Sequence, residues 1–175
     1  MPEAKTQTAQ PFNQGPYLSA AFLCETVLSE GNGVKSIIRI IDRFTITASG
    51  PNPPLQMPPI KRLFTLFVRL KSGMARGTYP LRVELIKPMA EKATKPFEKP
   101  MFLEGEEDRG LDIVIQMGIQ LDQEGIYWFK IFFNNQFLTQ VPLRVIYMPE
   151  VTQTGGQAQL GGPPGPQEPP TPGPS

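Results

Sequence analysis

Residues 125–148 of the chain read GIYWFKIFFNNQFLTQVPLRVIYM. The run from Ile126 to Phe133 and the run from Phe137 to Met148 are rich in aromatic and β-branched residues, which favour strands. Asn134-Asn135 stands between the two runs, and asparagine tolerates the positive φ angles that tight hairpin turns need. This stretch therefore predicts a β-hairpin at the end of an all-β domain.

The same alternation of apolar runs and turns continues upstream of the hairpin. Gly31-Asn32-Gly33 predicts a tight turn, and the β-branched run after it continues to Thr47 with a bend at Asp42-Arg43. Such glycine and asparagine clusters between apolar runs are typical of hairpins. Pro80 lies inside the alternating run from Thr78 to Lys87. Because proline has no amide hydrogen, this position predicts an edge strand or a bulge.

Counted along the chain, these runs make seven or eight short strands. That number of strands, with a turn between each pair, predicts a single antiparallel β-sandwich over residues 17–150. Residues 1–16 are mostly polar, and residues 151–175 are mostly proline, glycine and small polar residues. We expect both ends to be disordered, because such segments bury too little apolar surface to offset their chain entropy. The spacing Pro163-x-x-Pro166 suits docking to an aromatic groove, but a flexible spacer is the expected role.

The composition argues against several classes of function. The 175 residues include 17 basic and 16 acidic residues, no histidine and one cysteine. Zinc sites and proton transfer near neutral pH usually use histidine or cysteine, and nucleic-acid binding usually needs a dominant basic stripe. We therefore expect no enzyme, no cofactor and no nucleic-acid partner. The chain also has no signal-peptide pattern and no long apolar run, so we expect a cytoplasmic protein without membrane contact.

An acidic cluster is the first candidate for metal chemistry. It comprises Glu104, Glu106, Glu107, Asp108 and Asp112. Loops of a β-sandwich can hold calcium, but this cluster lacks the regular Asp-x-Asp spacing of calcium loops, and Arg109 lies within it. We interpret the cluster as a solvated loop and assign no metal site.

Cys24 and one carboxylate pair are the remaining candidates for catalysis. Cys24 lies in an apolar run, and the chain has no histidine to activate its thiol, so we expect a buried structural cysteine. Glu25 and Asp42 would face each other across a hairpin, as in the acid–base pair of a glycosidase. Asp42 is more simply explained as an ion-pair partner of Arg39 or Arg43. We therefore assign no catalytic residue.

The strand faces that should be polar give the strongest indication of function. In the run from Ile126 to Phe133 both alternate sets of side chains are mostly apolar, and apolar residues interrupt the polar face of the run from Arg62 to Lys71. If these two strands are neighbours, an apolar patch forms outside the core, made of Leu63, Phe67, Trp128 and Phe132. Exposed aromatic patches mark protein interfaces. The alternative is that a loop, residues 50–60 or 87–99, covers this face.

Two parts of the chain resemble known domains. Gly125-Ile126-Tyr127-Trp128-Phe129-Lys130-Ile131, followed by residues 137–145, resembles the closing hairpin of immunoglobulin-like domains, where a glycine and a tyrosine open the penultimate strand. Phe22-Leu23-Cys24-Glu25-Thr26-Val27, with Gly31 to Gly33 and Ile38 to Arg43, is similar to a family of small uncharacterised bacterial proteins. The resemblance covers residues 20–148 and implies an immunoglobulin-like β-sandwich and a bacterial origin, but no activity.

These observations predict a non-enzymatic protein-binding or assembly module. It would contact a protein partner or a second copy of itself through the apolar outer face or through the loops at one end. Three alternatives remain open. One is a carbohydrate-binding module in which Trp128 or a tyrosine stacks on a sugar ring. The others are a phage or virion structural protein and a hydrolase that relies on carboxylates alone.

Overall fold

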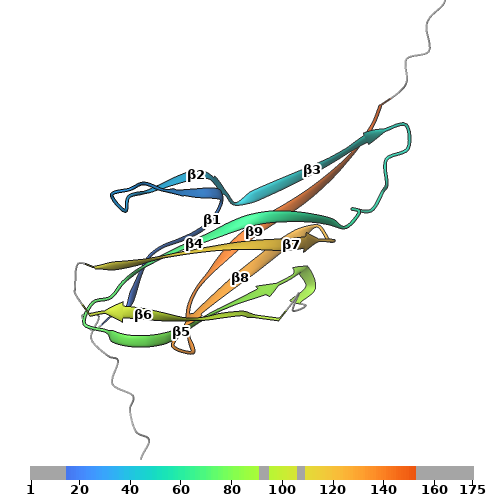
Figure 1. Ribbon diagram of the computed structural model, residues 1–175. Coiled ribbons are helices and arrows are strands. Elements are labelled where there is room, and N and C mark those ends of the chain that lie inside the picture. Colours follow the sequence, from blue (N-terminus) through green and yellow to red (C-terminus); the bar gives the residue numbers. More distant parts are fainter. Residues whose placement is uncertain (1–14, 91–94, 106–108, 153–175) are drawn as a thin grey trace, which may run out of the picture.

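The computed structural model describes residues 15–90, 95–105 and 109–152. Within these ranges it contains nine strands and one short 3-10 helix. They are β1 (Tyr17–Ser29), β2 (Lys35–Ile41), β3 (Arg43–Gly50), β4 (Ile60–Lys71), β5 (Arg76–Ile86), η2 (Pro88–Ala90), β6 (Phe97–Glu104), β7 (Gly110–Leu121), β8 (Gly125–Phe133) and β9 (Gln136–Val151) (Figure 1). Residues 1–14 and 153–175, where we expect disorder, lie outside the described residues, and so does the Pro-x-x-Pro spacing of the tail. No helix in the described ranges is long and apolar enough to cross a membrane.

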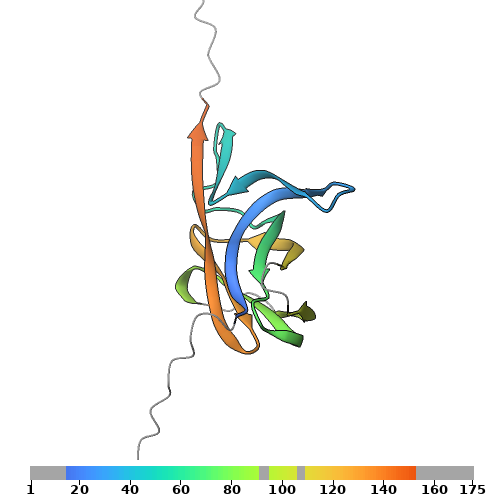
Figure 2. The ribbon, with the colours of Figure 1, turned by 90° about the vertical axis from the view of Figure 1, so that its left-hand side faces the viewer.

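The strands form two sheets (Figure 2). Sheet A has four strands in the order β2-β1-β4-β7, and sheet B has five in the order β3-β9-β8-β5-β6. The all-β prediction is confirmed, but the structure has nine strands rather than seven or eight. The expectation of wholly antiparallel pairing is also wrong, because β3 pairs with β9 in parallel, from Arg43 opposite Arg144 to Gly50 opposite Val151.

The bend at Asp42 explains both differences. There the chain passes from sheet A to sheet B, so the single return strand of the sequence becomes the two strands β2 and β3. The amide of Arg144 donates a hydrogen bond to the carbonyl oxygen of Asp42 at 2.9 Å, which ties the crossing point to β9. The register along β9 then fixes β3 as the edge strand of sheet B.

The central strands β4 and β8 supply the middle of the core. In each strand the residues that point into the core between the sheets alternate with residues that face outward, and on β4 the outward-facing Thr65 and Phe67 are buried as well. The inward set of β4 is Phe64, Leu66, Val68 and Leu70, and that of β8 is Tyr127, Phe129, Ile131 and Phe133. This is the period of two that a strand dictates, so the inward faces predicted for these runs are confirmed.

The hairpin between β8 and β9 turns at the predicted dipeptide. Asn134 and Asn135 have φ angles of 50° and 61°, and a two-residue turn with positive φ at both positions matches the right-handed twist of the flanking strands. The amide of Asn134 donates to the carbonyl oxygen of Pro80 at 2.9 Å. The turn therefore also holds the start of β5.

The prediction that Pro80 marks an edge strand or a bulge is wrong. Strand β5 lies inside sheet B, between β8 and β6. Pro80 is tolerated because the pairing of β5 with β8 begins one residue later, at Leu81, and because Pro80 faces Pro100 of β6. Two prolines cannot exchange amide hydrogen bonds, so this antiparallel pair is of the kind that needs none.

The hydroxyl group of Tyr127 fixes the turn between β7 and β8. It accepts hydrogen bonds from the amides of Asp122 at 3.2 Å and Gln123 at 3.1 Å, and it lies 3.1 Å from the Gln123 carbonyl oxygen, to which it donates. The side chain is fully buried, and this burial raises the pKa of Tyr127. One phenol thus satisfies three backbone groups of the turn.

We expect Tyr127→Phe to lower the free energy of unfolding by about 1–3 kcal/mol, because two buried amides lose their acceptor. Urea unfolding of the full chain measures this loss. Tyr79→Phe is the matched control, since the hydroxyl of Tyr79 makes one exposed hydrogen bond, to the Arg76 carbonyl oxygen. Equal losses for the two variants would contradict the role assigned to Tyr127.

An ion pair joins β4 to β7 on the outer face of sheet A. The guanidinium of Arg69 donates from Nε and Nη2 to the two carboxylate oxygens of Asp112, at 2.6 and 2.7 Å. The two residues are register partners. The hydrogen bonds from Arg69 lower the pKa of Asp112 below its ordinary value, and burial of the carboxylate opposes this effect.

We expect Asp112→Asn to destabilise the protein by about 1 kcal/mol at neutral pH. The effect is this small because Arg69 is partly exposed and solvent screens the ion pair. The pKa of Asp112 is lowered in the folded state. The contribution of the ion pair to the free energy of unfolding is therefore complete above the ordinary carboxyl pKa of about 3.9. It is lost as the pH falls through the lowered pKa. Urea unfolding from pH 7 to about pH 2.5 should show wild type and variant converging in acid. A difference in unfolding free energy that stays constant with pH would contradict the role assigned to the ion pair. The Glu98→Gln variant, which changes an exposed carboxylate, is the control.

Candidate functional site

The structure divides the four residues of the predicted patch between two surfaces. Leu63 and Phe67 lie on β4 in sheet A, whereas Trp128 and Phe132 lie on β8 in sheet B. All four belong to the outward sets of their strands, so the two pairs face away from each other on opposite sides of the domain. The condition that β4 and β8 are neighbours is not met, and the single four-residue patch is corrected to two separate faces.

The outer face of sheet A carries the larger apolar surface. We call it the sheet A patch, and it comprises Phe22 and Leu28 of β1, Ile38 and Ile40 of β2, Leu63 and Phe67 of β4, and Val114 of β7. Leu63 is 68% exposed and Ile40 is 63% exposed. Exposed apolar side chains of this size are typical of interfaces.

The strand registers explain how the sheet A patch is assembled. Phe22, Phe67 and Val114 are register partners across β1, β4 and β7, and the rings of Phe22 and Phe67 stack with centroids 5.2 Å apart. Phe67 is therefore only 2% exposed although it points outward. Its ring, together with that of Phe22, forms the buried floor of the patch.

Charged groups border the sheet A patch in neutral pairs. Arg69 and Asp112 lie on one side, and the guanidinium carbon of Arg69 is 5.7 Å from the Phe67 ring centroid. Arg39 and Glu25 lie on the other side, with a nitrogen–oxygen distance of 2.8 Å. Each cation is paired with a carboxylate, so the border carries no net charge from these four groups.

Trp128 and Phe132 lie on a more polar surface. The guanidinium of Arg82 stands over the Phe132 ring, 4.4 Å from its centroid, and the Phe137 ring meets the same ring edge-on at 5.8 Å. Lys130 separates the two aromatic residues along β8. Trp128 is partly buried and lines a hollow of about 410 Å³ beside Pro88 of η2. The segment after β5, one of the two loops considered as a cover, thus reaches the end of this face.

The only cysteine has the buried position expected from the sequence. Cys24 has no exposed surface, and its sulfur lies 3.6 Å from the carbonyl oxygen of Thr65, to which it donates. Burial raises the pKa of the thiol, which disfavours the reactive thiolate. Cys24 is the register partner of Ile40 on β2 and Thr65 on β4, so it shares the outer face of sheet A with the patch.

Three of the described acidic candidates form ion pairs, whereas the expected pairing of Asp42 with Arg39 is not found because Arg39 pairs with Glu25. Glu104 pairs with Arg109, Asp112 pairs with Arg69, and Glu25 pairs with Arg39 rather than with Asp42. Residues 106–108, which supply the other three carboxylates of the cluster, lie outside the described residues. Among the described residues, no group of three or more His, Cys, Asp or Glu is arranged to hold a metal ion.

Sequence reasoning missed most of the sheet A patch. Ile38 and Ile40 occur in a run of four isoleucines around Arg39, and this run reads as a strand buried on both faces. The structure makes β2 an edge strand instead, with Ile38 and Ile40 exposed. The informative signal was the combination of a short β-branched strand with Arg39 at its centre, because a charge inside an apolar strand is typical of an edge.

Comparisons with known proteins give a family and no activity. No curated protein matches the chain. Among solved structures, an alkylpurine DNA glycosylase, AlkC, from Pseudomonas fluorescens shows 12% identity and a TM-score of 0.39, with 58% of this chain and 27% of the glycosylase covered. An immunoglobulin-like protein from Pseudomonas aeruginosa shows 13% identity and a TM-score of 0.37, with 77% of this chain and 99% of that protein covered. At these scores neither likeness supports a conclusion about fold details or function.

The family match covers most of the chain. It extends over residues 19–146, from the second residue after the start of β1 into β9, and so includes the sheet A patch and all of sheet A except Tyr17 and Leu18. The chain therefore belongs to DUF6941, a family of unknown function.

Proposed function

We propose that this protein is a non-enzymatic assembly module that binds a second copy of itself through the sheet A patch. The observation that carries the proposal is the exposure of Leu63 and Ile40 on a face whose floor is the Phe22–Phe67 stack. Removing apolar surface of this kind from water lowers the free energy by about 25 cal/mol per Å². A partner that covers the face therefore stabilises the protein.

Two neutral ion pairs at the border support a second copy as the partner. In a two-fold symmetric contact the same surface meets itself, so any net charge would face a like charge. The pairs Arg69–Asp112 and Arg39–Glu25 carry no net charge. A partner of opposite charge would instead be favoured by a border of one sign.

Contact through the face is favoured over strand addition at the edge. Strand β2 is an edge of sheet A, and regular edge strands can pair with another chain. Arg39, in the middle of β2, has a φ angle of 55°, which interrupts the regular backbone that a second strand would need. The face itself has no such interruption.

We expect the full chain to form a dimer that Leu63→Asp and Ile40→Asp each weaken more than about tenfold, because each variant introduces a carboxylate into an apolar contact. Sedimentation equilibrium measures the dissociation constant. Phe102→Asp is the matched control, since Phe102 is 60% exposed on β6, outside the patch. This variant should dimerise like wild type.

Two outcomes would overturn the proposal. One is a wild-type chain that sediments as a 19.4 kDa monomer up to about 100 µM. The other is a dimer that Phe102→Asp weakens as much as Leu63→Asp does. Circular dichroism of each variant verifies that it is folded, so that lost association is not mistaken for lost structure.

A carbohydrate-binding module is the second candidate, and the hollow beside Trp128 favours it. The hollow of about 410 Å³ is lined by an aromatic ring together with the polar side chains of Lys130 and Gln140. An indole ring in a hollow with nearby hydrogen-bonding groups suits a sugar ring. Binding on a glycan array that Trp128→Ala removes and Leu63→Asp retains would favour this function over assembly.

We also infer an immunoglobulin-like arrangement of the sheets. Tyr127 supports it, because its hydroxyl group bonds to backbone groups of Asp122 and Gln123, five and four residues upstream. In immunoglobulin domains a tyrosine at the start of the penultimate strand makes such bonds. Strand β8, which Tyr127 opens, is the penultimate strand of the described chain.

A further inference from the structure

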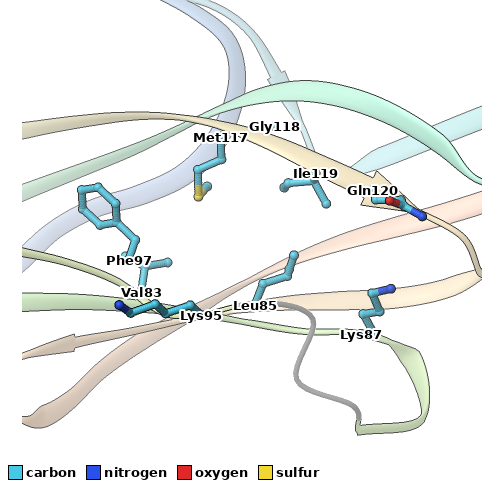
Figure 3. Close-up of a pocket in the computed structure, with 9 residues that line it drawn as sticks. All are labelled: Val83, Leu85, Lys87, Lys95, Phe97, Met117, Gly118, Ile119 and Gln120. Atoms are coloured by element: carbon cyan, nitrogen blue, oxygen red, sulfur yellow. The ribbon is translucent and has the colours of Figure 1, made fainter.

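A cleft of about 390 Å³ opens between the two sheets on the side away from β3. Its walls are β7 of sheet A and the strands β5 and β6 of sheet B (Figure 3). Both β7 and β6 are edge strands, each paired on one side only. The sandwich is therefore open along this side, and part of its interior is accessible.

Apolar side chains from both sheets line the interior of the cleft. Met117 and Ile119 project from β7 toward the opposite wall, where Val83, Leu85 and Phe97 project from β5 and β6 (Figure 3). Val83 and Ile119 are core residues, and the other three pack against the core. A ligand in the cleft would contact an apolar surface that is continuous with the core.

Charged groups at the cleft have one sign. Lys87 and Lys95 are among the lining residues, and no Asp or Glu is among the described residues that line it. The Lys87 ammonium pairs with Asp122 outside the lining. No ion pair of Lys95 is found among the described residues, and its side chain is exposed. Lys95 is therefore the group that can accept an anion.

We propose that this cleft binds an aliphatic carboxylate, with the hydrocarbon chain between Met117 and Leu85 and the carboxylate group at Lys95. The volume lies at the lower end of the usual range for small-molecule sites, about 300–1,000 Å³. It therefore suits one hydrocarbon chain of medium length. Apolar walls with one lysine that is not taken up in an ion pair with a described residue fit a molecule that is apolar along its length and anionic at one end. This site does not overlap the sheet A patch and does not depend on dimerisation.

Isothermal titration of the full chain with decanoate tests the proposal. We expect saturable binding at one site per chain. Decyltrimethylammonium has a comparable hydrocarbon chain with a cationic end, and it should bind at least about tenfold more weakly, because its head group meets Lys95. Phosphatidylglycerol vesicles are a third probe. The site is a recess for a free carboxylate, so we expect no cosedimentation with them.

Two variants and a control separate the contributions of the lysine and of the apolar walls to decanoate binding. Lys95→Glu should weaken decanoate binding by about tenfold or more, since it replaces the cation with a carboxylate at an exposed position. Met117→Trp should abolish binding by filling the cleft. Arg43→Glu makes the same change in net charge on β3, at the opposite edge of sheet B, and should bind like wild type.

Three results of the titrations would overturn the proposal. They are the absence of decanoate binding at millimolar concentration, equal affinities for decanoate and decyltrimethylammonium, and equal weakening by Lys95→Glu and Arg43→Glu. Cosedimentation with vesicles that Lys95→Glu abolishes would assign the same chemistry to a lipid surface instead and would likewise overturn it. Because Lys95 is exposed, its substitution leaves the core intact, so the test does not depend on whether Met117→Trp folds.

Discussion

The packing of β4 against β8 is the constraint on which the rest of the molecule depends. Both strands lie in the interior of their sheets, and alternate side chains from each are buried between the sheets. Because the side-chain period of a strand is two, burying Phe64 and Phe129 commits Leu63 and Trp128 to the outside. A slip of one residue in either strand would exchange the core with the outer face. The core and the candidate interface are thus two results of one register.

Much of the fold follows from local pattern, and the sequence predicts those parts well. The alternation in β4 and β8 and the Asn134-Asn135 turn are local features, and each has the predicted structure. What the pattern misses are pairings between distant segments. The parallel contact of β3 with β9 joins Arg43 to Arg144, and no short motif encodes it. The position of Pro80 inside sheet B likewise depends on where β8 ends and on Pro100 in another strand.

The candidate site was predictable only in part, for the same reason. Outward apolar residues on β4 and β8 can be read from the alternation, but their separation onto opposite faces depends on which strands share a sheet. The isoleucines of β2 look like core residues until β2 is known to be an edge strand. The cleft has no sequence signal of its own. It forms because β6 and β7 both end their sheets on the same side.

The pairing of β3 with β9 also has a consequence for the order in which the protein forms on the ribosome. Residues 43–50 leave the exit tunnel long before residues 144–151 have been made, because synthesis proceeds from the N-terminus at roughly 5–20 residues per second. During that interval β3 has no partner strand, and loop closure over such a separation is slow. Sheet A can be completed with β7, whereas sheet B must wait for the last strand. The edge formed by β3 is therefore the last part of the nascent domain to become ordered.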